Sequence, residues 1–508
     1  MEMTDFVKQK MNRTMKNRNS VILIGLLMLG LSSCDDFLEI PSETNLTSAT
    51  FFKTQSDFEK AVNGAYAPLR GIFVNTSWLL GEMHSDNTRY RYNPNFRAVI
   101  DQENIADFTV IATNVQARDK YRQYYLVIAR ANEILDRIDD VDFDANVKNN
   151  FKGQALFLRA LSYFDLVQYF GKVPLHLIPS TSLTDVYLPL SEVSDIYAQI
   201  IADATEAASL LPDKSVQQAG RATSGAAKTL LGNVHVVLKN WSAAETVLKE
   251  VVTSNKYSLV PSYADLFRTT NKNNSESVFE VQYRQGQDGY SSNFIYPWLP
   301  MPMTAAEITA TFTNYGVAPV GIAAQTTEGY NIPSPEIVAA YEAGDERKAA
   351  SIGTATAGGV DYPLIIKYLH PHSAATLTDD NFPIYRYSEV LLLLAEALDE
   401  QGKSSEALPY LNQVRDRAEL DDIASTANLR DVIFNERRVE LAFENKRWLD
   451  LVRTGRAVDV ISTFGASVKA DPQKYYFPAG QQPVPAAFTT IDLTFPLPAD
   501  EALLSPFF

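Results

Sequence analysis

The chain has 508 residues, and its 61 acidic side chains outnumber its 45 basic ones, giving a formal net charge of −16. This balance excludes a protein that binds the phosphate backbone of nucleic acids, which requires clustered lysine and arginine. One cysteine excludes an internal disulfide, and the length is sufficient for more than one domain.

The N-terminal segment is typical of a secretory signal. Arg13, Lys16 and Arg18 give it a positive start, and residues 21–31 form an unbroken apolar run. A helix that spans a bilayer needs roughly 20 apolar residues. The run is shorter than that and has the length expected of the apolar region of a signal peptide.

Cys34, the only cysteine, follows this run in the sequence Leu31-Ser32-Ser33-Cys34. The tetrapeptide resembles a bacterial lipobox, in which the cysteine receives a diacylglycerol group and becomes the first mature residue. Several acyl chains hold a protein stably on a membrane without a spanning helix. The alternative is an ordinary signal with a chance cysteine. Translation from Met15 would remove the unusual extension before it, and both starts, Met1 and Met15, remain open.

Helical periodicity dominates the chain after residue 115. Apolar and aromatic residues recur every three or four positions over 115–138, 147–170 and 192–211, which predicts three amphipathic helices. Gly171 and Pro174 supply the stop after the second helix. Residues 283–335 are rich in Pro, Gly, Asn and Thr without a sustained helical period, and strong helical patterns return from residue 384.

Two helical hairpins share one spacing of small and large residues. In 225–252, Gly232 is followed by Ala244, Leu248 and Val251, and in 387–418 the residues at the same offsets are Ala395, Ala407, Leu411 and Val414. A turn lies in the middle of each segment. This is the helix–turn–helix spacing of a tetratricopeptide (TPR) unit, in which small residues allow the paired helices to approach closely. Two unrelated amphipathic hairpins are the alternative.

Residues 435–459 combine two apolar helix faces with alternating charges. Glu436, Glu440 and Glu444 stand one helical turn apart, and Arg437, Arg438 and Arg447 lie among them. The pattern predicts a ladder of salt bridges. Paired carboxylates could also serve glycoside hydrolysis, but nearby arginines would keep these carboxylates ionised and structural.

Several motifs together resemble the SusD/RagB lipoproteins of Bacteroidetes nutrient-uptake systems. The resemblance runs from Cys34 to the C-terminus. Its motifs are CDDFLEIPSE from residue 34, LRALSYFDLVQYFGKVPL at 158–175, FPIYRYSEVLLLLAEAL at 382–398, ERRVELAFENKRWLDLVRTG at 436–455, FPLPADE at 495–501, and the hairpin at 226–260.

The resemblance implies a mainly α fold, a TPR-like superhelical scaffold of helix pairs with a loop-rich ligand-binding region. It further implies a protein anchored by lipid on the outer face of the outer membrane. Such a protein acts as a lid over a SusC-like TonB-dependent transporter and captures oligosaccharides or, in the RagB branch, peptides. Three parts are expected: a signal at 1–33, an N-terminal region at 34–270 with TPR-like pairs, and a C-terminal region at 271–508 with a loop-rich insert at 283–380 and closing helices.

No catalytic motif, metal site or cofactor site is predicted. The chain lacks G-x-S-x-G, H-E-x-x-H and a Gly-rich phosphate loop. Of the five histidines, His84, His176, His235, His370 and His372, only the last two are close in sequence. We expect that pair to be solvated loop histidines rather than metal ligands.

Two segments that we expect to be loops concentrate aromatic residues, at 75–97 and 283–298. An aromatic ring can cover the apolar face of a sugar, while neighbouring polar side chains bind its hydroxyl groups. Trp78 and Trp298 could instead be packing anchors, and Trp241 and Trp448 are expected in the core. The candidate ligand-binding residues are Trp78, Asp86, Asn87, Tyr90, Tyr92, Tyr283, Tyr290, Tyr296 and Trp298.

Three functions remain open from sequence. The favoured one is capture of oligosaccharide or peptide by a surface lipoprotein. A lipid-anchored extracellular hydrolase and a structural TPR adaptor that binds only its transporter are the alternatives. The sequence does not identify the glycan or the partner transporter.

Overall fold

The computed structural model describes residues 51–97, 100–180, 182–318, 320–321, 323–505 and 507. All the elements below belong to one compact unit, Thr54–Phe508. Cys34 and the signal-like segment lie outside the described residues, so the structure does not test their predicted roles.

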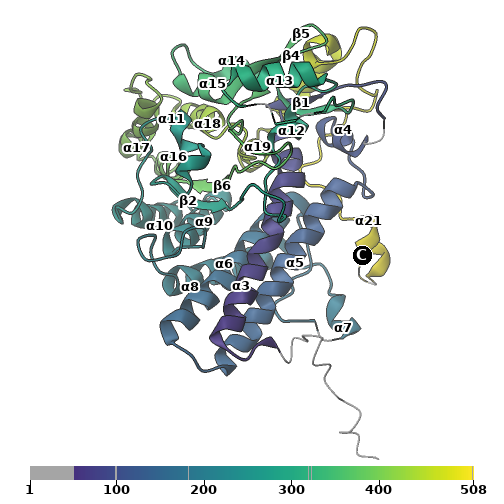
Figure 1. Cartoon of the computed structure of the whole chain (residues 1–508). Helices are drawn as coiled ribbons and strands as arrows, with labels where there is room; N and C mark the ends of the chain where they lie inside the picture. The colour runs from purple at the N-terminus through teal and green to yellow at the C-terminus, as the bar shows by residue number, and fades with distance from the viewer. Residues whose placement is uncertain are drawn as a thin grey trace, which may run out of the picture. The chain divides into compact units, whose positions relative to one another are not determined.

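Four long helices build the N-terminal part, and consecutive helices pack against one another. The second to fourth confirm the helices predicted at 115–138, 147–170 and 192–211, and the helix ending at Phe170 is followed by Gly171 at φ 72°. Figure 1 shows the first three side by side in purple and blue. The helices are α3 (Gln55–Gly71), α5 (Val115–Arg137), α6 (Ala145–Phe170) and α8 (Val193–Leu210).

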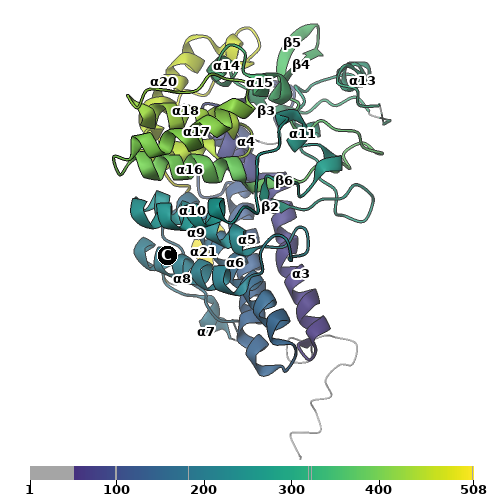
Figure 2. The ribbon, with the colours of Figure 1, turned by 90° about the vertical axis from the view of Figure 1, so that its left-hand side faces the viewer.

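The two predicted TPR hairpins are both present. The first consists of α9 (Ser224–Val237) and α10 (Trp241–Thr253), and the second of α16 (Tyr387–Asp399) and α17 (Ser404–Arg417). Helix α10 packs against α16, so the two hairpins stack as Figure 2 shows. Gly232 lies where its helix touches Leu248, since a Cβ added there would be 2.5 Å from the Leu248 Cδ2 atom. This close approach confirms the small-residue spacing.

The segment after the second hairpin folds into three helices, α18 (Leu429–Glu440), α19 (Arg447–Arg453) and α20 (Ala457–Ala470). A tight turn joins the first two, with Phe443 and Asn445 in the left-handed region at φ 66° and 63°. That turn lies against the N-terminal part, because a Cβ on Gly81 would come within 2.6 Å of the Asn445 carbonyl oxygen.

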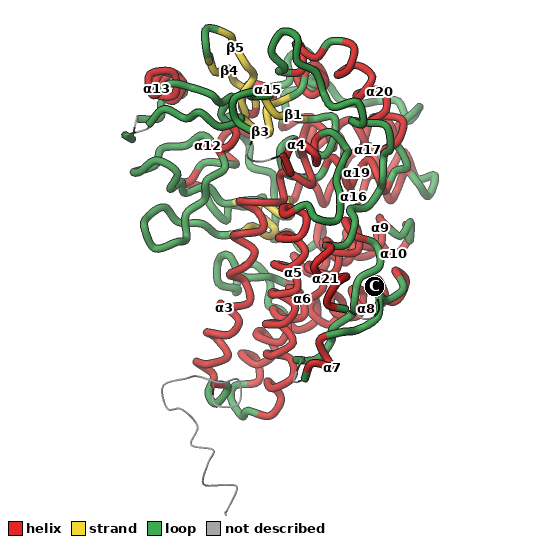
Figure 3. The backbone as a smooth tube through the Cα atoms, turned by 90° about the vertical axis from the view of Figure 1, so that its right-hand side faces the viewer, coloured by secondary structure: helices red, strands yellow, loops and turns green. Residues whose placement is uncertain are grey.

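The described strands form three two-stranded antiparallel sheets, drawn in yellow in Figure 3. Two of the sheets join segments far apart in sequence, whereas the third is a hairpin turned by Gly358 and Gly359, both with positive φ. The pairs are β1 (Thr88–Arg91) with β3 (Gly329–Pro333), β2 (Ser277–Val281) with β6 (Phe382–Arg386), and β4 (Ile352–Ala357) with β5 (Val360–Ile365).

Short helices connect these elements. The α-helices are α4 (Ile100–Ala106), α7 (Leu183–Val186), α11 (Tyr263–Leu266), α12 (Ile295–Trp298), α13 (Ala305–Asn314), α14 (Pro335–Ala340), α15 (Glu346–Ser351) and α21 (Ala499–Leu504). Three 3₁₀ turns lie at Ile138–Asp140, Thr269–Asn271 and Pro472–Tyr475.

Two segments are more regular than the sequence pattern indicated. The expected loop at 75–97 instead continues α3 through two π-helical turns, Ile72–Ser77 and Leu79–Met83, and then forms β1. The segment at 283–335 contains the ten-residue helix α13, which a capping box between Thr304 and Glu307 starts. Both expectations of irregular structure were wrong because burial and capping, rather than apolar periodicity, stabilise these elements.

Within the described part of the chain, no helix has both the length and the apolar character needed to cross a membrane.

Candidate functional site

The structure buries most of the residues that the sequence nominated for ligand binding. Tyr290 is 44% exposed and Tyr92 is half-buried. The other seven are at most 7% exposed: Trp78, Asp86, Asn87, Tyr90, Tyr283, Tyr296 and Trp298. Buried side chains offer no free face to a ligand in this conformation, so the site has to be built around the exposed groups.

Trp78 and Trp298 pack against each other inside the protein. Their ring centroids are 6.0 Å apart, and Trp298 also contacts Phe294 and Tyr368 at 5.6 Å and 5.6 Å. The Trp78 indole donates a hydrogen bond to the Val74 carbonyl at 2.8 Å. These contacts favour the interpretation of Trp78 and Trp298 as packing anchors.

Asp86 and Asn87 hold the turn before β1 onto the C-terminal helices. Arg447 donates to both Asp86 oxygens at 2.7 and 2.9 Å, and Arg438 pairs with the same carboxylate at 2.8 Å. Burial opposes ionisation, but the two arginines lower the pKa of Asp86 below its ordinary value. Arg438 also donates to the Asn87 side-chain oxygen at 2.9 Å.

The buried tyrosines fasten neighbouring segments. The Tyr283 hydroxyl donates to the Arg70 carbonyl at 2.8 Å, which ties the end of α3 to the chain after β2. Tyr296 is hydrogen-bonded to His372 at 2.6 Å, and Tyr90 donates to Asp107 at 3.0 Å. Tyr92 stacks on Phe477 with centroids 5.3 Å apart.

Tyr290 is the nominated aromatic residue that faces solvent. Two guanidinium groups lie over its ring, that of Arg70 at 4.8 Å and that of Arg284 at 5.5 Å from the centroid. Arg284 is paired with Asp288. An exposed ring flanked by hydrogen-bond donors has the mixed character of a carbohydrate platform.

A hollow of about 340 Å³ opens beside this ring. Arg70 lines the hollow and also contacts the ring. We call it the α3–β2 hollow. Its base includes Leu69 of α3 and Phe279 and Val281 of β2. Its polar side chains are Glu59, Asn63, Tyr66, Arg70, Gln218, Arg221, Glu280 and Gln282. The volume lies within the range of small-molecule sites, about 300–1,000 Å³.

The wall of the hollow is held in place by hydrogen bonds. Arg221 donates to Asn63 at 2.8 Å and to Gln218 at 2.8 Å. Gln282 packs so closely on the opposite loop that a Cβ on Gly220 would lie 2.5 Å from it. Amide and guanidinium groups of this kind match the donor and acceptor pattern of sugar hydroxyl groups.

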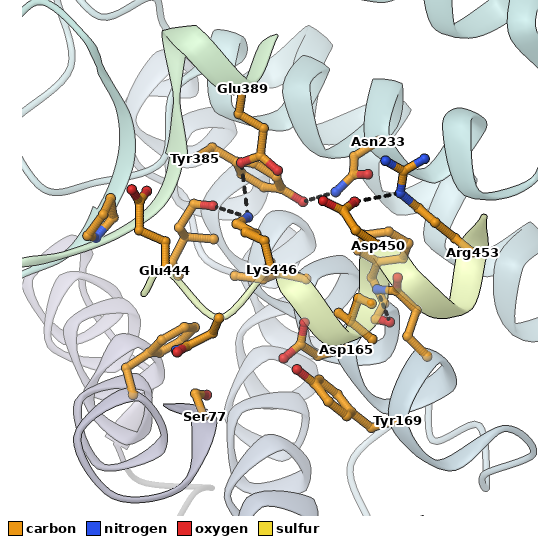
Figure 4. Close-up of a pocket in the computed structure, with 18 of the residues that line it drawn as sticks. Ser77, Asp165, Tyr169, Asn233, Tyr385, Glu389, Glu444, Lys446, Asp450 and Arg453 are labelled. Carbon is orange, nitrogen blue, oxygen red and sulfur yellow. Dashed lines mark hydrogen bonds and ion pairs between the residues drawn. The ribbon is translucent and has the colours of Figure 1, made fainter. Parts of the chain in front are cut away.

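A second, smaller cavity lies between the N-terminal helices and the C-terminal motif (Figure 4). Its charges are paired: Lys446 with Glu389 at 3.0 Å, and Lys120 with Asp165 at 3.3 Å. Its volume is about 60 Å³. One water needs about 10–15 Å³ of such space, so the cavity is too small for a sugar ring.

The glutamates of the 435–459 motif form buried ion pairs, as predicted, but with other partners. Glu440 binds Arg347, Arg386 and Arg417, and not the interleaved arginines. Glu436 pairs with Arg347 and Arg415, and Glu444 pairs with Lys367 and Arg386. Burial alone would raise the pKa of Glu440, but the three guanidinium groups lower it well below its ordinary value. An ionised carboxylate locked in this way is not poised as a general acid.

Neighbouring residues hydrogen-bond the rings of the histidine pair. His370 is hydrogen-bonded to Asp380 at 2.5 Å, and His372 is only 8% exposed. The expectation of solvated histidines was wrong for His372, because Tyr296 and the His370 carbonyl bind its ring nitrogens. Among the described residues, no group of three or more His, Cys, Asp or Glu side chains could hold a metal ion.

Sequence reasoning did not nominate the α3–β2 hollow. Its residues come from α3, from the loop at 217–221 and from β2, and no local motif links these three segments. Of the two tryptophans expected in the core, Trp448 is 0% exposed whereas Trp241 is half-buried.

The fold and the hollow define a class of protein: a helical-repeat scaffold that presents a polar binding surface. The SusD family model matches residues 252–506. A SusD-like model described as starch-binding and associating with the outer membrane matches residues 36–236. The chain therefore belongs to the SusD family, and relatives with SusD names include a starch-binding and a laminarin-binding protein.

Individual relatives cover nearly the whole chain. The SusD-like protein P38 of Formosa agariphila is 28% identical over 483 residues, which cover 87% of this chain and 92% of that protein. The starch-binding protein SusD of Bacteroides thetaiotaomicron is 24% identical over 516 residues, covering 86% and 90%. A solved laminarin-binding SusD-like protein superposes with a TM-score of 0.71 at 25% identity, covering 89% of this chain and 98% of that one.

Proposed function

We propose that this chain is a surface lipoprotein that captures oligosaccharides and delivers them, unhydrolysed, to a SusC-like TonB-dependent transporter in the outer membrane. The observation that carries the proposal is the α3–β2 hollow, a polar site of about 340 Å³ next to the exposed ring of Tyr290. The relatives that bind starch and laminarin support a glycan as the ligand.

Membrane attachment in the proposal depends on Cys34. The lipobox-like sequence before it and the positive, apolar segment at its N-terminal side support acylation of this thiol. The variant Cys34→Ala should then leave the membrane pellet, and a variant that still sediments with outer membranes would contradict the anchor.

Binding without turnover distinguishes this function from its alternatives. The full chain, purified in detergent, is titrated by calorimetry with laminari-, malto- and xylogluco-oligosaccharides and with short peptides, and each mixture is then chromatographed. We expect one glycan class to bind and to keep its chain length. Shortened products would indicate a hydrolase, binding of peptides alone would indicate a RagB-like protein, and binding of neither would leave a structural adaptor.

A further inference from the structure

The guanidinium group of Arg70, at the edge of the α3–β2 hollow, has no hydrogen-bond or ion-pair partner among the described residues. Arg70 lies in the last turn of α3 and is half-buried. Every other arginine of the described residues makes a hydrogen bond or an ion pair through its side chain. The Arg70 guanidinium makes neither, and its recorded contact is with the ring of Tyr290, 4.8 Å away.

The position of this group is fixed by its surroundings. The Tyr283 hydroxyl holds the Arg70 carbonyl at 2.8 Å, so the backbone at the end of α3 is anchored. The flat Tyr290 ring covers one part of the guanidinium. Arg70 also lines the hollow, so its guanidinium is within reach of a ligand bound there. A planar fork of donors in this setting suits a carboxylate or sulfate, to which it can donate two parallel hydrogen bonds.

The other charged groups of the hollow all have partners within the protein. Arg221 lies 3.5 Å from Glu59 and donates to three side-chain amides. Glu280 accepts hydrogen bonds from the Asn273 backbone at 2.7 Å and from Asn381 at 2.7 Å. Of the two arginines that line the hollow, Arg221 has a carboxylate partner and Arg70 has none in the described part of the chain.

We propose that the α3–β2 hollow selects acidic oligosaccharides. The carboxylate or sulfate ester of one sugar binds the Arg70 guanidinium, and the hydroxyl groups of the adjoining sugars bind Asn63, Gln218 and Gln282. This proposal rests on the proposed function of glycan capture, and it specifies the chemical class of the glycan.

Binding of matched ligand pairs to the full chain in detergent tests whether the hollow selects acidic oligosaccharides. Each pair shares a backbone and differs in charge: oligogalacturonate and its methyl ester, glucuronoxylo- and xylo-oligosaccharides, and sulfated and desulfated galactan oligomers. We expect the acidic member of one pair to bind more tightly, and added salt to reduce that preference. Arg70→Gln should weaken the acidic ligand about 10- to 100-fold, as expected for a charged hydrogen bond, and leave its neutral partner nearly unchanged.

Two further variants complete the experiment. Arg70→Lys keeps the charge without the planar fork and should give an intermediate loss. Arg430→Gln removes an exposed arginine of α18 and should bind like the wild type. Equal affinity for acidic and neutral members, or an Arg70→Gln protein that keeps its acidic preference, would overturn the inference and leave glycan capture standing. If no oligosaccharide of any pair binds but a laminari-, malto- or xylogluco-oligosaccharide does, the inference fails and glycan capture stands. If none of these oligosaccharides binds, glycan capture fails as well.

Discussion

Glu440 illustrates how single residues connect distant parts of this chain. Its side chain is fully buried and binds guanidinium groups from three segments: Arg347 of α15, Arg386 at the end of β6 and Arg417 of α17. Breaking a buried ion pair on one side leaves uncompensated charge in the interior, which is more costly than losing the pair itself.

Replacing this carboxylate should destabilise the fold strongly. Glu440→Gln is expected to lower the free energy of unfolding by about 3–5 kcal/mol, because three arginines lose their shared anion. Urea unfolding followed by circular dichroism measures the change. The control, Glu192→Gln, removes a carboxylate that is 64% exposed and paired with Lys172, and it should cost less than about 1 kcal/mol.

The stability difference between the wild type and Glu440→Gln should depend on pH. The arginines lower the pKa of Glu440 in the folded state below its ordinary 4.5. Its contribution is therefore complete above about pH 4.5 and is lost as the pH falls toward the folded-state pKa. The difference in unfolding free energy between wild type and Glu440→Gln should shrink on acidification, and a difference that grows would contradict this account.

At the scale of elements, some helical glycines lie at close helix contacts and others face open space. A Cβ on Gly232 would lie 2.5 Å from Leu248, whereas a Cβ on Gly64 of α3 meets nothing within 4 Å. Both residues lie inside helices, so the same substitution should act in opposite directions at the two sites.

Gly232→Ala should destabilise the protein by about 1–3 kcal/mol through overpacking. Gly64→Ala should stabilise it by about 0.5–1 kcal/mol, because alanine favours the helix. Thermal unfolding of both variants against the wild type checks the two signs. A neutral Gly232→Ala would show that the first TPR hairpin tolerates wider spacing than the structure has.

The sequence predicted helices better than it predicted their surroundings. The TPR hairpins follow from local spacing, because the residues that touch, such as Gly232 and Leu248, belong to one hairpin. Strand β1 and the π-helical turns before it could not be predicted in this way. Strand β1 is paired with β3, more than two hundred positions away, as in Thr88 with Pro333.

At the scale of the whole molecule, the aromatic content of a segment does not indicate whether its rings are exposed to a ligand. Trp78 and Trp298 lie in segments that looked like ligand loops, yet they form one buried cluster with Phe294 and Tyr368. Tyr290 is the sequence candidate that reaches solvent. The neighbouring hollow is assembled from three separate segments, so its amides and Arg70 carry no motif that a single sequence would reveal.

Membership of the SusD family accounts for the scaffold, whereas the proposed ligand face consists of Tyr290 and the α3–β2 hollow. We expect the exposed ring of Tyr290 and the adjacent α3–β2 hollow to bind the glycan, and the buried tryptophans to support the fold.

One titration tests most directly whether Tyr290 binds the glycan while the buried tryptophans only support the fold. The oligosaccharide that binds the wild type is titrated by calorimetry into Tyr290→Ala and Trp298→Phe, with thermal unfolding recorded for each protein. We predict that Tyr290→Ala keeps its unfolding temperature and loses affinity about tenfold, equivalent to about 1.4 kcal/mol, while Trp298→Phe unfolds at lower temperature with unchanged affinity. Wild-type affinity in Tyr290→Ala, together with lost binding in a folded Trp298→Phe protein, would contradict the account and return the ligand site to the tryptophan cluster.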